Sequence, residues 1–453
     1  MAHPPPGRGV KEALARAAYA LLLRAATPLY LLRLWWRGRQ EPAYRTRWRE
    51  RLGWATPVCA ASGAPVTVAE GRVWVHAVSL GETLAAAPLV HALREQRPGL
   101  QLLLTHSTAT GREAGARLLR PGDAQAWLPY DTPGAVRRFF RAQRPALGVV
   151  METEVWPALL QAAQTAGVPM VLANARLSAR SAAKGRRLAA LLHPALARFA
   201  SVLAQTEADA QRLREAGARE VQVLGNLKFD ITPAPALLAR GQAWRAGLGR
   251  PVVLAAVTRE GEEAPLLAAW AQTAAPRPLL LLVPRHPQRF DEVAALVAAA
   301  GLQLQRRSQW QATPPAKAAQ ADVWLGDSLG EMAQYYACAD VALLGGSFAP
   351  LGGQNLIEAA ACGCPLLMGP HTFNFAQAAE DALAAGAAER LPDLSAAVAR
   401  ALALVADADA GPERASDAAT ARQAMASRAR AFAQAHQGAA GRMAAAINAR
   451  LGG

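Results

Sequence analysis

Short apolar runs alternate with longer alanine- and leucine-rich stretches along most of the chain. An apolar run of a few residues between polar or glycine-rich segments is typical of a strand buried on both faces of a parallel sheet. The longer stretches are long enough for the helices that connect parallel strands. In the first half we expect strands at residues 73–77, 101–105, 146–151, 170–173, 201–204 and 221–224, and helices at residues 83–96, 110–119 and 157–166.

The alternation stops at residues 232–238, a segment rich in proline and alanine that reads as a linker, and then starts again. Strands of the second half are expected at residues 251–256, 278–283, 323–325, 341–344 and 365–368. This pattern predicts an α/β protein with two successive doubly wound, Rossmann-like domains. We expect a cleft between them, with ligands bound beyond the carboxyl ends of the strands.

The N-terminal residues 11–36 are apolar and compatible with a helix, but Arg16, Arg24 and Arg33 interrupt them. A membrane-spanning helix needs about 20 largely uncharged residues, and the longest uncharged stretch here is residues 25–32. We therefore expect a monotopic or marginally inserted anchor, with an amphipathic helix packed on the protein itself as the alternative. The expected domains are an anchor segment at residues 1–52, an N-terminal domain at 53–231 and a C-terminal domain at 232–453.

The positive charge is concentrated at the N-terminus. The formal net charge is +15, and residues 1–52 contain eleven Lys and Arg against three Glu, a net +8. This favours a membrane surface or another anionic partner for that segment. Because the sequence has no recognised nucleic-acid motif, we expect no nucleic-acid partner.

A glycine-rich stretch at residues 343–370 follows an expected strand. Glycines let a backbone approach a ligand closely, and the N-terminus of a following helix attracts an anion such as phosphate. The helix is expected to open at Gln354, and Glu358 lies about one turn after Asn355, where a carboxylate suits the hydroxyls of a ribose. The alternative is an ordinary tight turn with Glu358 in solvent. The candidate ligand-binding residues of this loop are Gly345, Gly346, Ser347, Gly352, Gly353, Asn355 and Glu358.

Carboxylates follow two strands of the first half. Glu82 comes after the strand at residues 73–77 and can act as a general base, although a glutamate favoured in the first turn of a helix is an equally good explanation. Glu152 and Glu154 follow the strand at residues 146–151. They either bind an acceptor or orient cations, and Arg176 adds a guanidinium after the next strand.

Three cationic or titratable side chains are further candidates. Lys228 lies at the expected domain junction, in a chain with four lysines, and its ammonium group suits a carboxylate or phosphate partner. Arg285 directly follows the strand at residues 278–283 beside His286, and its guanidinium suits a leaving phosphate ester. Asp407 and Asp409 form a D-x-D pair in an alanine-rich stretch away from any strand end. We expect no metal site and no cofactor.

Several segments together resemble one family, the 3-deoxy-D-manno-octulosonic acid (Kdo) transferases of lipopolysaccharide synthesis. The resemblance covers roughly residues 10–375, begins with the basic apolar N-terminus and keeps the order of segments in that family. The matching segments are HAVSLGE, METEVWP, NARLSARS, GNLKFD, VPRHPQRF and LGDSLGEMAQYYACADVALLGGSFAPLGGQNLIEAAACGCPLLMGPHTFNF.

The resemblance implies a GT-B fold and the transfer of Kdo from CMP-Kdo to a lipid A precursor, lipid IVA, at the cytoplasmic side of the inner membrane. Arg285, His286 and the glycine-rich loop would hold the donor, with Asn355 and Glu358 on its phosphate and ribose. Lys228 would contact the charge of the donor or acceptor, and Glu82 matches the proposed base. Glu152, Glu154 and Arg176 would lie on the acceptor side. The alternatives are another GT-B nucleotide-sugar enzyme and a non-catalytic lipid A-binding scaffold.

Overall fold

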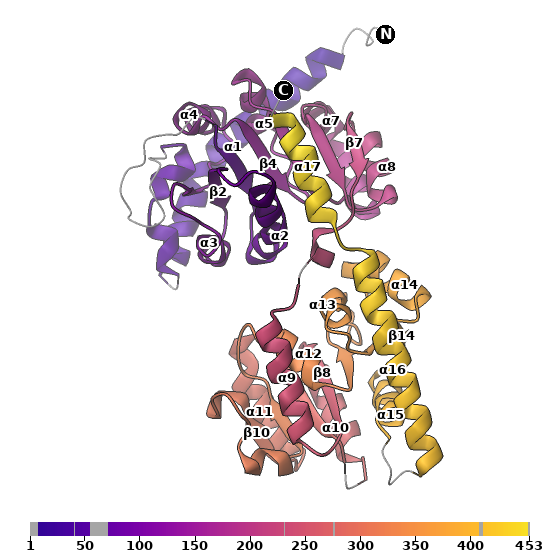
Figure 1. Cartoon of the computed structure of the whole chain (residues 1–453). Coiled ribbons are helices and arrows are strands. Elements are labelled where there is room, and N and C mark those ends of the chain that lie inside the picture. Colours follow the sequence, from indigo (N-terminus) through magenta and orange to yellow (C-terminus); the bar gives the residue numbers. More distant parts are fainter. Residues whose placement is uncertain are drawn as a thin grey trace. The chain divides into compact units, whose positions relative to one another are not determined.

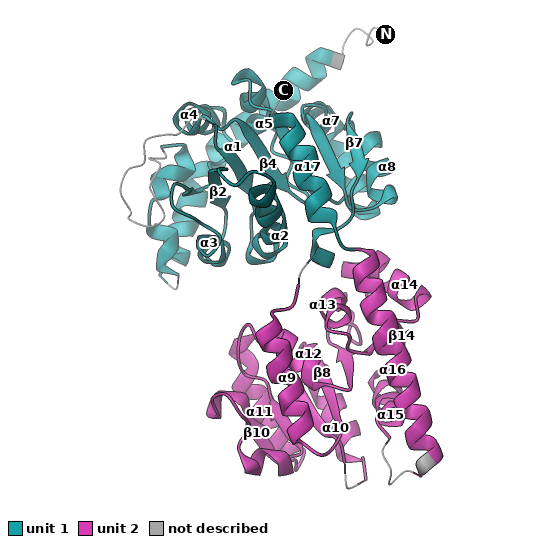
Figure 2. Cartoon of the chain, in the orientation of Figure 1, with its two compact units in different colours: residues 1–230, 437–453 teal, residues 231–436 magenta. Residues whose placement is uncertain are grey.

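The chain forms two compact units in a computed structural model (Figure 2), which describes residues 8–39, 41–54, 71–230, 232–274, 277–406 and 411–451. Unit 1 consists of Met1–Asp230 and Gln437–Gly453, and unit 2 is Ile231–His436. Each unit is built around a sheet of seven parallel strands. The expected α/β class and the parallel sheets are confirmed.

The sheet of unit 1 has the strand order β3-β2-β1-β4-β5-β6-β7. Its strands are β1 (Val73–His76), β2 (Leu102–His106), β3 (Ala124–Trp127), β4 (Leu147–Met151), β5 (Met170–Ala175), β6 (Ser201–Ala204) and β7 (Val221–Val223). Its helices are α1 (Arg8–Arg37), α2 (Leu80–Gln96), α3 (Ala109–Ala116), α4 (Pro133–Gln143), α5 (Pro157–Thr165), α6 (Ala179–Gly185), α7 (Ala189–Leu196), α8 (Glu207–Glu215) and α17 (Ala439–Leu451).

Both faces of this sheet are covered, because successive side chains of a strand point to opposite faces. Trp74 packs with residues of α4, α5, α7 and α8 on one face. Val73 and Val75 pack with α2 and α17 on the other face. The continuous apolar runs of the sequence therefore correspond to strands buried on both sides.

One side of helix α1 packs against the rest of unit 1, and much of the apolar surface of the helix is exposed. The Tyr19 hydroxyl donates to Asp131 Oδ2 at 2.9 Å, and the Tyr30 and Tyr130 rings lie 5.9 Å apart. Leu21 and Leu22 are 69% and 66% exposed. By length and composition alone, Gly9–Arg37 is also apolar enough to cross a membrane.

The end of the expected anchor segment belongs to the folded body of unit 1. The 3₁₀ helices η1 (Pro42–Arg45) and η2 (Trp48–Leu52) bring Glu50 and Arg51 into the interior. The Glu50 carboxylate accepts from the Trp127 backbone N–H at 2.7 Å, and the Arg51 guanidinium lies 4.2 Å from the Trp127 ring centroid. This corrects the expectation for residues 1–52, because Arg51 is committed to protein contacts rather than to lipid.

The sheet of unit 2 has the order β10-β11-β9-β8-β12-β13-β14. Its strands are β8 (Val252–Thr258), β9 (Leu279–Pro284), β10 (Leu304–Arg306), β11 (Val323–Leu325), β12 (Val341–Leu344), β13 (Leu366–Met368) and β14 (Ala388–Arg390). Its helices are α9 (Pro235–Gly247), α10 (Glu263–Ala271), α11 (Phe290–Ala299), α12 (Met332–Cys338), α13 (Leu356–Ala361), α14 (Ala376–Ala384), α15 (Leu394–Leu404) and α16 (Pro412–Ala435).

The C-terminal tail divides between the two units (Figure 1). Helix α16 packs within unit 2, whereas Met443 and Ile447 of α17 are fully buried in the core of unit 1 beside α2. Gly438, with φ +91°, separates the two helices. The expected C-terminal domain, residues 232–453, is therefore too long by its last 17 residues, Gln437–Gly453.

Candidate functional site

Strands β1 and β4 are neighbours in the sheet of unit 1. Strands β2 and β3 follow β1 on one side, and β5, β6 and β7 follow β4 on the other side, so the strand order reverses between β1 and β4. At such a switch point the loops after the two strands separate and leave room for a ligand. Glu82 follows β1, and Glu152 and Glu154 follow β4. The structure therefore brings these three predicted carboxylates to one edge of the sheet.

Glu82 lies in the first turn of α2 and is partly buried. Its Oε2 accepts from the Val78 backbone N–H at 2.8 Å, so one oxygen has the helix-capping role that the sequence left open. Burial raises the pKa of this carboxyl to about 7. The Val78 bond opposes that rise, while the negative charges of Glu154 and Glu152 add to it. A carboxylate with a pKa near neutrality is suited to accept a proton.

Glu152 and Lys228 meet beside Glu82. Lys228 Nζ lies 3.8 Å from Glu152 Oε1, and its charge lowers the pKa of Glu82. Glu152 has φ +56°, a left-handed conformation that is uncommon outside glycine and is found at functional sites. The structure thus places Lys228 with the carboxylates of unit 1.

Arg176 follows β5 at the same edge, with an exposed side chain. Its backbone N–H donates to the Glu152 carbonyl at 3.2 Å. Burial raises the pKa of Glu154, and the charge of Glu152 adds to that rise. The predicted acceptor residues Glu152, Glu154 and Arg176 therefore share one rim.

Unit 2 has its own switch point between the neighbouring strands β8 and β12. The glycine-rich loop follows β12, and the segment Thr258–Glu262 follows β8. The two strand ends approach so closely that a β-carbon at Gly345 would lie 2.3 Å from the Val257 carbonyl oxygen. Val257 itself has φ +59°, which is strained for a β-branched residue.

A buried carboxylate that sequence reasoning missed fills the glycine-rich loop. Glu262 Oε2 accepts from the Gly346 N–H at 2.7 Å, and Oε1 accepts from the Phe348 and Ala349 N–H groups at 3.2 and 3.3 Å. Glu262 is 2% exposed. These N–H groups are therefore not free for an anionic ligand, which corrects the expectation for Gly346. The signal was the acidic pair in TREGEE directly after a strand.

Ser347 is also a structural residue. Its side chain is fully buried, its hydroxyl donates to the Leu344 carbonyl, and its Oγ accepts from the Gly369 N–H at 2.8 Å. Gly352 and Gly353 have φ +90° and +74°, and the Gly353 N–H closes the loop onto the Gly346 carbonyl at 2.7 Å. Ser347 and the glycines therefore shape the loop.

Asn355 and Glu358 are in the expected register at the start of α13. Asn355 is the N-cap, and its Oδ1 accepts from the Ile357 N–H at 3.2 Å. The helix has six residues, so its dipole is a weaker attraction for an anion than the sequence suggested. Glu358 is half-buried, its carboxylate makes no hydrogen bond or ion pair with the described residues, and burial raises its pKa. Such a carboxylate is suited to hydroxyl donors.

The cations of unit 2 gather after β8 and β9. Arg285 is exposed, and the Arg285 N–H donates to the Thr258 carbonyl at 2.9 Å. Burial, followed by the positive charges of Arg259 and Arg285, lowers the pKa of His286. Arg259 is a second residue that sequence reasoning missed. Its Nε is buried without a hydrogen-bond partner among the described residues, so this donor is available for an anion.

Within the ranges that the structure describes, no group of three or more His, Cys, Asp and Glu side chains is placed to hold a metal ion. Asp407 and Asp409 lie outside the described residues.

The family model and the relatives found by comparison with known proteins carry the same description. The family model described as 3-Deoxy-D-manno-octulosonic-acid transferase (kdotransferase) matches residues 46–231. The chain is 50% identical over 449 residues to 3-deoxy-D-manno-octulosonic acid transferase of Bordetella pertussis, covering 97% of this chain and 100% of that protein. It is 35% identical over 366 residues to the Haemophilus influenzae enzyme of the same name, covering 80% of this chain and 83% of that one.

Solved structures share the fold at low sequence identity. Anabaena HepE in complex with UDP covers 84% of this chain and 99% of its own, with a TM-score of 0.56 and 16% identity. A glycosyltransferase from Rickettsia africae covers 84% and 98%, with a TM-score of 0.55 and 11% identity. The two parallel sheets and these relatives together show that the chain is a glycosyltransferase with the GT-B fold and belongs to the 3-deoxy-D-manno-octulosonic acid (Kdo) transferase family.

Proposed function

We propose that the protein transfers Kdo from CMP-Kdo to a phosphorylated and acylated lipid A precursor (lipid IVA) at the cytoplasmic side of the inner membrane. One observation carries the catalytic part. Glu82 lies at the switch point of unit 1, keeps its Oε1 free of hydrogen bonds to the described residues, and has a pKa raised to about 7. This combination suits a general base at neutral pH.

Unit 2 offers the groups that a cytidine monophosphate ester needs. Arg285, Arg259 and His286 supply donors for one phosphate. Glu358, with its half-buried carboxylate, suits the hydroxyls of the ribose, and Asn355 Nδ2 lies one turn before it. Glu262 and Ser347 would act by holding the loop in shape. We place donor binding here because Arg259, whose Nε is one of several buried arginine nitrogens without a partner among the described residues, lies with Arg285 beside His286 at this switch point.

The proposed reaction is a single displacement. A hydroxyl oxygen of the acceptor disaccharide attacks the anomeric carbon of Kdo and forms the new glycosidic bond. The bond from that carbon to the phosphate oxygen breaks, and CMP leaves with the electron pair, so the configuration inverts. Glu82 accepts the hydroxyl proton, and the unit 2 cations offset the charge that develops on the phosphate. Lys228 would hold Glu152 and screen the carboxylates around Glu82.

The membrane location is supported by α1 and by the charge that follows it. The helix exposes leucines and two tryptophans, Trp35 and Trp36, at 53% and 68%. Tryptophans prefer the headgroup region, and arginines near helix ends extend to it. An acylated, phosphorylated acceptor would be presented at the same surface.

The test incubates the purified full-length protein with CMP-Kdo and the tetraacylated precursor, and measures products by mass spectrometry. We expect one or more Kdo additions. Glu82→Gln should lower kcat by ~10²–10⁴-fold, the usual contribution of a general base, with CMP affinity unchanged. Glu95→Gln, an exposed glutamate on the same helix, is the matched control and should keep full activity.

Three other results would contradict the proposal. Tighter binding of UDP than CMP in calorimetry would favour another nucleotide-sugar enzyme of the same fold. Full transfer activity of Glu82→Gln would remove Glu82 from the mechanism. An absence of transfer together with tight acceptor binding would favour a non-catalytic scaffold.

A further inference from the structure

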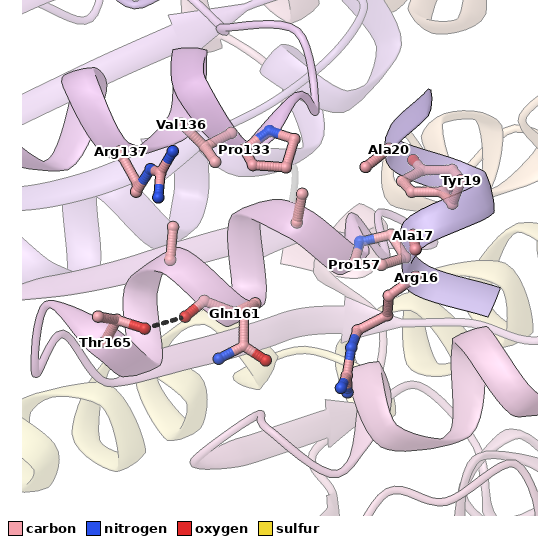
Figure 3. A pocket seen from close by; sticks show the side chains of 12 residues that line it. Arg16, Ala17, Tyr19, Ala20, Pro133, Val136, Arg137, Pro157, Gln161 and Thr165 are labelled. Carbon is pink, nitrogen blue, oxygen red and sulfur yellow. Dashed lines mark hydrogen bonds between the residues drawn. The ribbon is translucent and has the colours of Figure 1, made fainter. Parts of the chain in front are cut away.

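A mostly apolar cavity of about 320 Å³ lies beneath α1 in unit 1 (Figure 3). We call it the α1 cavity. Small and apolar side chains from three helices form its walls: Ala17 and Ala20 of α1, Pro133 and Val136 of α4, and Ala158 and Ala162 of α5. Its volume is in the range of small-molecule sites. Pockets with mostly apolar walls and a few polar groups are typical of sites for ligands with an apolar part.

The α1 cavity has a fixed wall at one end. Asp131 accepts from the Ala158 and Leu159 N–H groups at the start of α5, at 3.1 and 2.6 Å, and from the Tyr19 hydroxyl of α1 at 2.9 Å. This arrangement holds α1 against the N-terminus of α5. The cavity is therefore a built space between anchored helices.

The cavity begins at the edge of the sheet that carries the candidate catalytic groups. Pro133 and Pro157 are the first residues of α4 and α5, which follow β3 and β4, so both lie at the carboxyl edge of the parallel sheet. Glu154 is three residues before Pro157. From there the cavity follows α5 as far as Thr165, roughly 12 Å at a rise of 1.5 Å per residue.

The charges around the cavity select an anionic amphiphile over a neutral one. Arg16 of α1 and Arg137 of α4 line it, and Figure 3 shows them on opposite sides of the space. Arg198 is held by Gln161 Oε1 at 2.7 Å. Burial, and next the positive charge of Arg16, lowers the pKa of Arg198. The charges of Arg16 and Arg198 therefore repel each other, the charge of Glu12 offsets part of that repulsion, and an anionic ligand group would offset more of it.

We propose that the α1 cavity binds one acyl chain of the lipid acceptor, with Arg16 and Arg137 beside the phosphorylated end of the molecule. This rests on the proposed function. Pro133 and Pro157 of the cavity lie at the sheet edge that also carries Glu152 and Glu154, so an acceptor with its sugar at that edge can place a chain under the helix. Each buried methylene favours binding by roughly fourfold, so a few methylenes distinguish acylated from acyl-free acceptors.

The test uses the full-length protein in detergent micelles with a precursor that carries a diazirine near the end of one acyl chain. We expect ultraviolet light to attach it to peptides of α1, α4 or α5. Ala17→Phe should fill the cavity, reduce labelling and raise KM for the tetraacylated acceptor at least tenfold. KM for CMP-Kdo and for an acyl-free bisphosphorylated disaccharide should not change. Ala13→Phe adds the same apolar area to an exposed position of α1 outside the cavity and should behave as wild type.

A second variant, which changes α5 and leaves α1 intact, controls for misfolding of α1. Ala158→Leu fills the cavity from α5, and Ala166→Leu, at the exposed end of that helix, is its control. The inference is overturned if labels map elsewhere, if each variant acts like its control, or if phosphatidylglycerol displaces the probe as well as unlabelled acceptor does. Labelling in the cavity without any Kdo transfer would instead overturn the proposed function and leave the lipid site standing.

Discussion

The Glu82 carboxylate is subject to two effects that favour opposite charge states. Its Oε2 stabilises the start of α2 through the Val78 N–H, whereas burial and two neighbouring glutamates disfavour its charge. A residue with only a capping role gains from being ionised, because the helix N-terminus favours a negative charge. The raised pKa therefore points to a role beyond capping.

The pH dependence of the reaction should report this pKa. We expect kcat/KM to rise with pH and to level off above pH 7, because Glu82 accepts a proton only when it is ionised and its pKa is about 7. The sign for stability is opposite. A carboxyl whose pKa is raised by folding stabilises the protein fully below its unfolded value, and this contribution is lost as the pH rises through about 7.

Glu82→Gln separates the two effects. Its melting temperature should exceed that of wild type at pH 8 and equal it at pH 4, while transfer is lost at both. A melting temperature below wild type at pH 8 would mean that the ionised carboxylate is needed for the cap.

Glu262 should control donor affinity without touching the donor. In Glu262→Gln an amide NH₂ replaces one oxygen and meets backbone N–H groups. Either the Gly346 bond and the Arg259 N–H bond to Oε2 are then lost, or the Phe348 and Ala349 bonds. We expect the Kd for CMP to rise at least tenfold in calorimetry. Glu260→Gln changes an exposed glutamate of the same segment and should leave the Kd within about twofold of wild type. An unchanged Kd in Glu262→Gln would show that the loop holds its shape without this carboxylate.

The sequence located the strand-end residues well because parallel strands with short apolar runs fix where each loop begins. It did not show that Glu262 fills the loop around Gly346, since these residues are more than 80 positions apart and meet through sheet pairing of β8 with β12. It also did not show that Lys228, expected to contact the charge of the donor or acceptor, lies 3.8 Å from Glu152 Oε1 in unit 1.

At the scale of elements, the strands that the sequence missed are β3, β10 and β14, each at or near an edge of its sheet. Their sequences, AQAW, LQR and AER, are short and contain polar residues. An edge strand is paired on one side and needs less apolar surface than a central strand. The hydrophobic pattern therefore identifies central strands and gives little signal for these.

Helix α1 should bind membranes through its exposed leucines. We expect the double substitution Leu21→Gln with Leu22→Gln to lower partition into anionic liposomes at least tenfold, because burying one leucine is worth ~1.5–3 kcal/mol. The Kd for CMP should not change, since donor binding is proposed for unit 2. Sedimentation with liposomes measures partition. Leu329→Gln, at a leucine of unit 2 that is 76% exposed, is the control, and equal partition of both variants would refute the anchor.

At the scale of the whole molecule, the chain passes between the units twice, near Asp230 and near Gln437. Asp230 links the two passages within unit 1, because its carboxylate accepts from the Gly438 and Ala440 N–H groups. The alanine- and arginine-rich tail could not be assigned from composition, since the same residues build α16 in unit 2 and α17 in unit 1.

Helix α17 should stabilise unit 1 selectively. Ile447→Ala removes a fully buried side chain from its core, and such changes cost about 2–5 kcal/mol. Hydrogen exchange followed by mass spectrometry should show faster exchange in β1, β2 and α2 with unit 2 unaffected. Met425→Ala, a buried methionine of α16, should show the reverse, and loss of protection throughout both units in either variant would contradict this division.

The position of α17 also sets an order of events during synthesis. A ribosome delivers the chain from its N-terminus, so β1–β7 leave the exit tunnel long before the helix that covers one of their faces. Until the whole of unit 2 has been translated, unit 1 lacks α17, and the apolar surface beside α2 that this helix covers is accessible to chaperones. A message that lacks its last few codons would therefore yield a protein whose defect appears at the opposite end of the sequence.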